Sequence, residues 1–147
     1  MSNGPVVPPL PPAPSLAPHL VIDGAAAALD FYKKALGATE LVRVPSEDGK
    51  RLLHAHMEVN GAAVFLCDDF PEHPGEGAIA PKRLGGTSAM IHLQVKNCDA
   101  AVKRAADAGA KVIAEPWDAF WGDRYAQIMD PFGHVWSFAH PLPGNPA

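Results

Sequence analysis

Long apolar runs, cysteines and clustered positive charge are all scarce in this sequence. No hydrophobic run approaches the roughly 20 residues that cross a bilayer, and the N-terminus lacks the basic region and continuous apolar segment of a secretory signal. The two cysteines, Cys67 and Cys98, form neither a C-x-x-C pattern nor a disulfide framework. The 12 Lys and Arg residues are scattered in a chain of net charge −4, which argues against a nucleic-acid surface. We therefore expect a cytoplasmic protein with no membrane and no nucleic-acid partner.

Proline, in contrast, is abundant, and six of the 16 prolines lie within residues 5–14 (PVVPPLPPAP). Such a stretch favours polyproline II and lacks the N–H donors of a sheet ladder. Residues 1–18 are therefore predicted to be an extension of their own. Two interpretations stay open, a flexible tail and a segment that lies across a partner subunit.

The sequence contains an internal repeat. Residues 19–41 (HLVIDGAAAALDFYKKALGATEL) parallel residues 92–113 (HLQVKNCDAAVKRAADAGAKVI), so that His19 and His92 occupy equivalent positions. Each copy passes from an apolar strand through an aspartate suited to capping into an alanine-rich helix that ends at a glycine. Helical spacing places the apolar residues on one face of each helix: Ala25, Ala28, Leu29 and Tyr32 in the first, and Val102, Ala105 and Ala106 in the second.

Three strand candidates follow each helix. They span residues 39–44, 51–59 and 62–67 in the first copy, with a tight turn at Asn60-Gly61, and 110–114, 124–129 and 134–139 in the second. The sequence thus predicts an α+β fold in which tandem βαβββ modules form a curved, cup-shaped mixed sheet with helices on its outer face. We assign a single domain to 19–141, with modules at about 15–67 and 87–140, a connector at 68–86 and a C-terminal tail at 142–147.

Residues 120–141 (FWGDRYAQIMDPFGHVWSFAHP) have the character of a β-hairpin. Asp130-Pro131 starts its turn, and Gly133 tolerates the positive φ that such a turn requires. Together with the W-G-D-R-Y run, this hairpin resembles the last hairpin of the vicinal oxygen chelate superfamily. That superfamily comprises glyoxalases, bleomycin resistance proteins and dioxygenases, and the resemblance is greatest to its PhnB-like branch. The resemblance implies the same two-module fold as the internal repeat.

Members of this superfamily that do chemistry usually hold a divalent metal in the cup with His and Glu ligands. Carried onto this sequence, the resemblance puts those ligand positions at Ala17, Phe65, Met90 and Ser137. Phe and Ala cannot bind a metal ion, and Ser and Met bind hard divalent cations poorly. The resemblance therefore supports the fold and undermines the usual chemistry, and no metal is expected at the family positions.

Histidines keep a second interpretation open. His54 and His56, with Glu58, alternate along one strand and project from one face, where they could share a metal or simply be solvated. His19 and His92 lie two residues beyond the vacant ligand positions and share their cavity-facing parity. They are candidates for ligand contact, with a hydrogen-bonded core role as the alternative.

The last hairpin contributes the mouth of the predicted cup. There, Trp121 and Arg124 accompany Asp123, and Arg124 could clamp an anionic group or form a salt bridge to Asp123 or Asp130. Trp136 and Phe138 lie on the opposite parity from Ser137 and are expected under the helices.

We therefore predict a metal-free, small-molecule-binding homodimer of the glyoxalase/bleomycin-resistance type. Its ligand should carry an acidic or vicinal-oxygen group beside an apolar portion. The cup would be lined by His19, Phe65, Met90, His92, Ser137, Trp121 and Arg124. The alternative is a metal-dependent lyase, isomerase or dioxygenase that holds Zn, Ni, Mn or Fe on His19, His54, His56 or His92.

Overall fold

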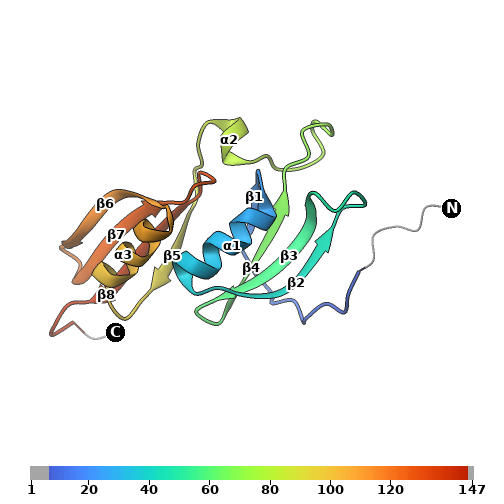
Figure 1. Ribbon diagram of the computed structural model, residues 1–147. Helices are drawn as coiled ribbons and strands as arrows, with labels where there is room; N and C mark the ends of the chain where they lie inside the picture. The colour runs from blue at the N-terminus through green and yellow to red at the C-terminus, as the bar shows by residue number, and fades with distance from the viewer. Residues whose placement is uncertain (1–6, 146–147) are drawn as a thin grey trace.

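The computed structural model describes residues 7–145, so residues 1–6 of the proline-rich extension and residues 146–147 lie outside the described residues. Figure 1 shows two modules side by side with a connector between them. The first module contains β1 (His19–Ile22), α1 (Ala25–Leu36), β2 (Thr39–Pro45), β3 (Leu52–Val59) and β4 (Ala62–Asp68). The connector carries a short helix, α2 (Pro81–Leu84). The second module contains β5 (Met90–Gln94), α3 (Cys98–Ala108), β6 (Lys111–Asp118), β7 (Asp123–Met129) and β8 (Val135–Pro141).

The predicted α+β fold of two βαβββ modules is confirmed. The strands form two four-stranded sheets, in the orders β1-β4-β3-β2 and β5-β8-β7-β6. In each sheet the first strand of the module runs parallel to the last, and the remaining pairs are antiparallel. Within residues 7–145 no strand of one sheet pairs with a strand of the other, so the two sheets do not close on each other. One chain therefore supplies two halves of a cup.

The helices cover one face of each sheet. The predicted apolar face of α1 is buried, with Tyr32 and Leu29 fully inaccessible. Val102 and Ala105 of α3 are buried as well. Both helices end at a left-handed glycine, as the repeat predicts. Among residues 7–145, no helix covers the second face of each sheet, which we call its open face.

The helix N-termini differ from the sequence prediction. The aspartate before α1, Asp23, does not cap it; instead Oδ1 of Asp68, at the end of β4, accepts hydrogen bonds from the backbone N–H groups of Gly24 (2.9 Å) and Ala25 (3.0 Å). In α3 the capping side chain is Asn97, which accepts from the N–H of Ala100. The sequence could not show these choices, because the cap of α1 comes from a strand 43 residues away.

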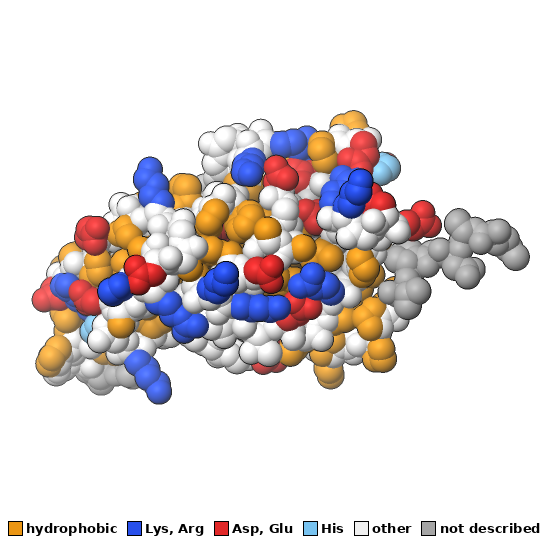
Figure 2. All heavy atoms as spheres, in the orientation of Figure 1, with side chains coloured by type: hydrophobic (Ala, Val, Ile, Leu, Met, Phe, Trp, Pro, Cys, Tyr) orange, Lys and Arg blue, Asp and Glu red, His pale blue; other side chains and the backbone are white. Residues whose placement is uncertain are grey.

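The modules join through their helix layers rather than through their sheets. Helix α1 packs against α3, and Tyr32 of α1 reaches the turn between β7 and β8, where it contacts the ring of Trp136 (centroids 5.3 Å apart). The ring nitrogen Nε2 of His134 bonds the carbonyl of Val21 at 2.9 Å. One apolar core therefore runs through both modules, with Trp136 and Phe138 buried in it as predicted. In the same view, Figure 2 shows acidic and basic side chains interspersed across the face turned to the viewer.

Within residues 7–145 the longest helix has 12 residues, and none is long and apolar enough to cross a membrane.

Candidate functional site

The open face of the first sheet carries a cluster of three histidines around Phe65. Strand pairing sets His19 of β1, Phe65 of β4 and His56 of β3 in one row across the sheet. The Phe65 ring lies edge-on to all three imidazoles, with centroid distances of 5.9 Å to His19, 5.0 Å to His54 and 4.9 Å to His56. We call these four residues the histidine cluster. It joins an apolar ring to imidazoles that both donate and accept hydrogen bonds.

Two members of the histidine cluster have unusual surroundings. His56 is only 4% exposed, and its Nε2 atom has no hydrogen-bond partner among the described residues. Buried polar atoms are nearly always paired, so a bare imidazole nitrogen is a position where a polar group would be stabilised. Burial, and then the neighbouring His19 and His56, lowers the pKa of His54 below its usual value. His54 is therefore neutral at pH 7.

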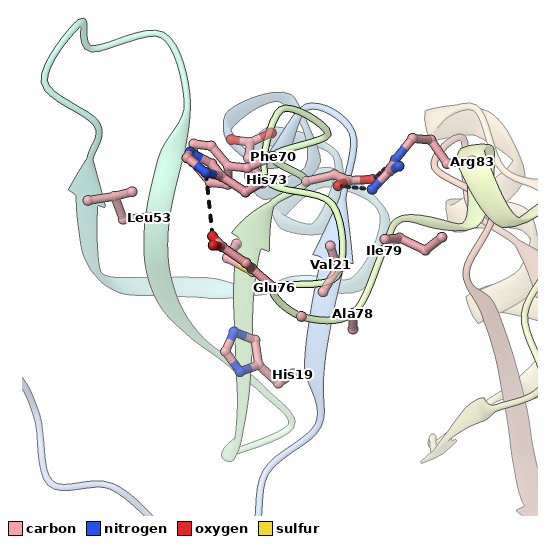
Figure 3. Close-up of a pocket in the computed structure, with 13 residues that line it drawn as sticks. His19, Val21, Leu53, Phe70, His73, Glu76, Ala78, Ile79 and Arg83 are labelled. Atoms are coloured by element: carbon pink, nitrogen blue, oxygen red, sulfur yellow. Dashed lines mark hydrogen bonds and ion pairs between the residues drawn. The ribbon is translucent and has the colours of Figure 1, made fainter.

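Beside this cluster lies a cavity of about 580 Å³. Figure 3 shows His19 at its lower side, with the connector loop arching over it through Phe70, His73, Glu76 and Ile79. A volume of this size suits a drug-sized ligand. The cavity walls are formed by the ends of β1 and β4 together with a loop that the sequence analysis assigned to the connector.

Ion pairs fix the connector loop to the body of the protein. Arg83 forms a two-pronged bond to Asp69, which also accepts from the N–H of Ala80. On the other side, Arg51 pairs with Glu72 and lies 4.2 Å from the centre of the Phe70 ring. These pairs lower the pKa of the Asp69 and Glu72 carboxyls, that of Glu72 to about 2. The roof of the cavity is thus pre-formed.

The cavity contains no activated thiol. Cys67 lines it, but burial and the adjacent Asp68 and Asp69 raise the pKa of the thiol. Burial likewise raises the pKa of Cys98 to about 11. Since the thiolate is the nucleophile, neither cysteine is suited to attack a substrate at neutral pH.

The open face of the second sheet carries a different arrangement around His92. Its Nδ1 lies 2.8 Å from Ser137 Oγ, and its Nε2 lies 2.6 Å from Gln94 Oε1. Because an amide oxygen only accepts, the partners assign the ring proton to Nε2 and make Nδ1 the acceptor of the serine hydroxyl. The ring of Tyr125 stacks over His92 at 12°. His92 is exposed and held on three sides, whereas Ser137 is only 2% exposed and so is not an accessible nucleophile.

The structure divides the predicted cup residues into two groups. His19 and Phe65 lie together on the first sheet, and Met90, His92 and Ser137 lie on the second, with Met90 54% exposed. Trp121 is also at the end of the second sheet, where its Nε1 donates to Asp123. No strand of one sheet pairs with a strand of the other among residues 7–145, so the two groups do not meet across a strand pair within one chain.

The predicted role of Arg124 requires a correction. Its side chain is directed to the helix layer, where it forms a two-pronged bond to Asp99 in the first turn of α3 and a further bond to Asp118. The predicted alternative was a salt bridge to Asp123 or Asp130. Arg124 does form salt bridges, but its partners are Asp99 and Asp118. The reason is parity: Arg124 alternates with Tyr125, which faces the open side. The guanidinium is thus not placed to clamp an anion in the cup.

The donor set at the family metal positions does not fit a divalent metal. Phe65 and Ser137 are paired in register with His19 and His92, so each histidine has a non-ligand where the family pattern requires a carboxylate. In the part of the chain that the structure describes, no three His, Cys, Asp or Glu side chains come together as a metal site. That finding includes His54, His56 and Glu58.

Sequence reasoning missed several residues of these two surfaces. Gln94 and Tyr125 could have been found from alternation along their strands, because they share the parity of His92 and Ser137. The loop residues Phe70, His73 and Glu76 gave no such signal, since an irregular connector has no periodicity that indicates which way a side chain faces.

The matching family model is the Glyoxalase/Bleomycin resistance protein/Dioxygenase superfamily, which covers residues 16–138. The chain belongs to this superfamily.

Particular relatives extend the comparison. The chain is 51% identical over 129 residues to the uncharacterized protein Mb0911c of Mycobacterium bovis, covering 88% of this chain and 84% of that one. It is 33% identical over 135 residues to the anthracycline biosynthesis protein DnrV of Streptomyces peucetius, covering 88% of this chain and 42% of that one. The crystal structure of the Arabidopsis thaliana gene product At5g48480 superposes with a TM-score of 0.68 at 28% identity, covering 87% of this chain and 99% of that one.

Proposed function

We propose that this protein binds a small molecule on the open faces of its sheets and does so without the metal of its superfamily. The observation that carries the proposal is the register of Phe65 with His19 and of Ser137 with His92. Both carboxylate positions are filled by side chains that do not bind hard cations, while the neighbouring histidines remain. A recognition or sequestration role follows from a site that keeps its shape and loses its metal ligands.

The histidine cluster and its cavity define the chemistry of the ligand. Of the histidine cluster, His19 lines the cavity and offers a hydrogen bond there, while the ring of Phe65 lies edge-on to His19 and adds an aromatic surface beside it. We therefore propose a ligand that carries oxygen groups beside an apolar portion. One relative of the chain is named an anthracycline biosynthesis protein, and an anthracycline-like molecule is one candidate ligand.

A homodimer would complete the cup. The edge strands β1 and β5 each pair on one side only among residues 7–145, and each carries one of the histidines predicted to line the cup, His19 and His92. A twofold partner that brings the second sheet of one copy against the first sheet of another would cover both edges. Sedimentation should show a species of twice 15.5 kDa at micromolar concentration. A mass of 15.5 kDa alone would contradict the dimer.

The proposal also includes a branch of the superfamily and a cellular environment. The W-G-D-R-Y run with the D-P-x-G turn favours the PhnB-like branch of the superfamily. The free thiols of Cys67 and Cys98 are in keeping with a reducing, cytoplasmic environment.

Two measurements test the proposal. Elemental analysis of protein purified without added metal should find less than stoichiometric Zn, Ni, Mn and Fe. Stoichiometric metal that disappears in His19→Ala or His54→Ala would establish instead the alternative, a metal-dependent lyase, isomerase or dioxygenase. A thermal-shift screen of chelator-treated protein should then yield ligands whose stabilisation is lost in Phe65→Ala and kept in Arg124→Ala. Equal stabilisation of both variants would place the ligand elsewhere.

A further inference from the structure

An exposed aromatic surface lies at the end of the second module, formed by Trp117, Phe120, Trp121 and Tyr125. Phe120 is 98% exposed, Trp121 46% and Trp117 39%. The rings pack edge to face, with centroids 5.0 Å apart for Trp117 and Tyr125, 5.1 Å for Phe120 and Trp121, and 5.3 Å for Trp121 and Tyr125. Soluble proteins seldom leave such a contiguous apolar patch open to water without a partner.

Hydrogen bonds hold two residues of the aromatic surface in place, Trp121 and Tyr125. Trp121 is anchored by its Nε1 bond to Asp123, and the Tyr125 hydroxyl accepts from Gln127 Nε2 at 3.1 Å. The phenolic hydrogen of Tyr125 is therefore available to a carbonyl oxygen. Pre-ordered rings lower the entropic cost of docking, and they suit a partner that is itself apolar and stiff.

The chain supplies a segment with those properties. Residues 7–18 contain six prolines and no Asp, Glu, Lys or Arg. Their apolar side chains are open to water, with Val7 56%, Leu10 55% and Leu16 87% exposed. Proline-rich segments dock on Trp and Tyr surfaces because the stiff polyproline helix loses little entropy and presents unpaired carbonyls.

The position of this segment excludes docking on the aromatic surface of the same chain. Figure 1 shows the segment on the side of the first module, whereas β6 and β7 lie at the opposite end of the molecule. The segment leads directly into β1, an edge strand, and the carbonyl of Pro18 already accepts the N–H of Phe65. In a dimer that sets the first sheet of one copy against the second sheet of the other, the segment approaches the partner.

We infer that residues 7–16 of one copy dock on the aromatic surface of a second copy and strap the dimer together. The inference rests on the proposed homodimer. Prolines and Leu10 would cover Trp117, Phe120 and Trp121, and the Tyr125 hydroxyl would donate to a backbone carbonyl of the strap.

Photo-crosslinking of the full chain tests the strap. Benzoylphenylalanine in place of Leu10 is irradiated in a mixture of ordinary and ¹⁵N-labelled chains, so that mass spectrometry separates crosslinks within a chain from those between chains. Crosslinks between chains to residues 117–125 are expected, and Phe120→Ser should reduce their yield about tenfold by removing an aromatic anchor. The matched control carries the same probe in place of Leu84, which is 61% exposed on the connector, and should not reach residues 117–125.

Sedimentation of the same samples separates the two proposals. A dimer whose Leu10 crosslinks fall elsewhere, or only within one chain, overturns the strap and leaves the homodimer standing. A monomer overturns the homodimer, and the strap with it. Unchanged crosslink yield in Phe120→Ser also overturns the strap, because the contact would then not depend on the aromatic surface.

Discussion

The hydroxyl of Tyr32 donates a 2.5 Å hydrogen bond to Oδ2 of Asp130, which ties the helix of the first module to the last hairpin of the second. The same oxygen accepts from the Trp136 indole, while Oδ1 accepts from the backbone N–H groups of Phe132 and His134. Burial, and then the charge of Asp130, raises the pKa of Tyr32 well above 10. The hydroxyl therefore stays protonated, and remains a donor, at physiological pH.

We expect Tyr32→Phe to lower the free energy of unfolding by about 1.5–3 kcal/mol, the worth of a hydrogen bond to a charged group. Asp130→Ala should cost more, because it also leaves the Trp136 indole unpaired in the core. Urea denaturation measures both. Tyr125→Phe is the matched control, since the hydroxyl of this partly exposed residue bonds only Gln127 among residues 7–145, and should change the free energy by no more than about 0.5 kcal/mol. Equal effects in Tyr32→Phe and Tyr125→Phe would contradict a stabilising role of the Tyr32–Asp130 hydrogen bond.

Asp68→Ala should destabilise the first module. The carboxylate accepts from Gly24 and Ala25 at the start of α1 and from the N–H of Leu52 at 2.6 Å. Its loss leaves three donors without partners, at a cost of about 2–4 kcal/mol. Asp23→Ala, which removes the aspartate that the sequence favoured as the cap, should cost no more than about 0.5 kcal/mol. If denaturation curves showed Asp23→Ala to be the more destabilising of the two, Asp23 would be the cap of α1, as the sequence predicts.

Stability should fall as pH falls below about 6.5, the unfolded value for histidine. The pKa of His54 is lowered in the folded protein. Between that lowered pKa and 6.5 the unfolded chain binds a proton that the folded chain does not, so stability rises with pH across this window. Thermal unfolding from pH 5 to 8 should show a shallower slope in His54→Gln. If the pH dependence of stability were unchanged in His54→Gln, the histidine cluster would not disfavour the protonated form of His54.

Arg124→Ala should lower the melting temperature slightly and leave ligand affinity unchanged. The side chain pairs with Asp99 and Asp118 on the helix layer, and it lowers the pKa of Asp99. The stabilisation should therefore disappear in acid, as Asp99 is protonated. Calorimetry with a ligand from the thermal-shift screen measures the affinity. A large loss of affinity in Arg124→Ala would return this residue to the binding site.

Much of the fold was predictable because it depends on short-range patterns. The apolar spacing of Ala28, Leu29 and Tyr32 sets the buried face of α1, and the repeat of His19 and His92 identifies the first strand of each module. The turn Asn60-Gly61 has the positive φ values, 51° and 77°, that those residue types favour. Each of these features is decided by neighbours within a few residues.

Alternation along the strands also predicted part of the site, placing His19, Phe65, His92 and Ser137 on open faces. It could not identify Asp99 as the partner of Arg124, because Asp99 lies 25 residues away in the sequence.

The sequence by itself determined the two βαβββ modules and the absence of carboxylates at the two in-register positions. Local periodicity and residue type are sufficient for both. Only the tertiary structure decided that the modules join through Tyr32 and Asp130, that the connector roofs a cavity, and that the two open faces do not close within one chain. These features depend on contacts between residues far apart in the sequence, whose energies no local pattern encodes.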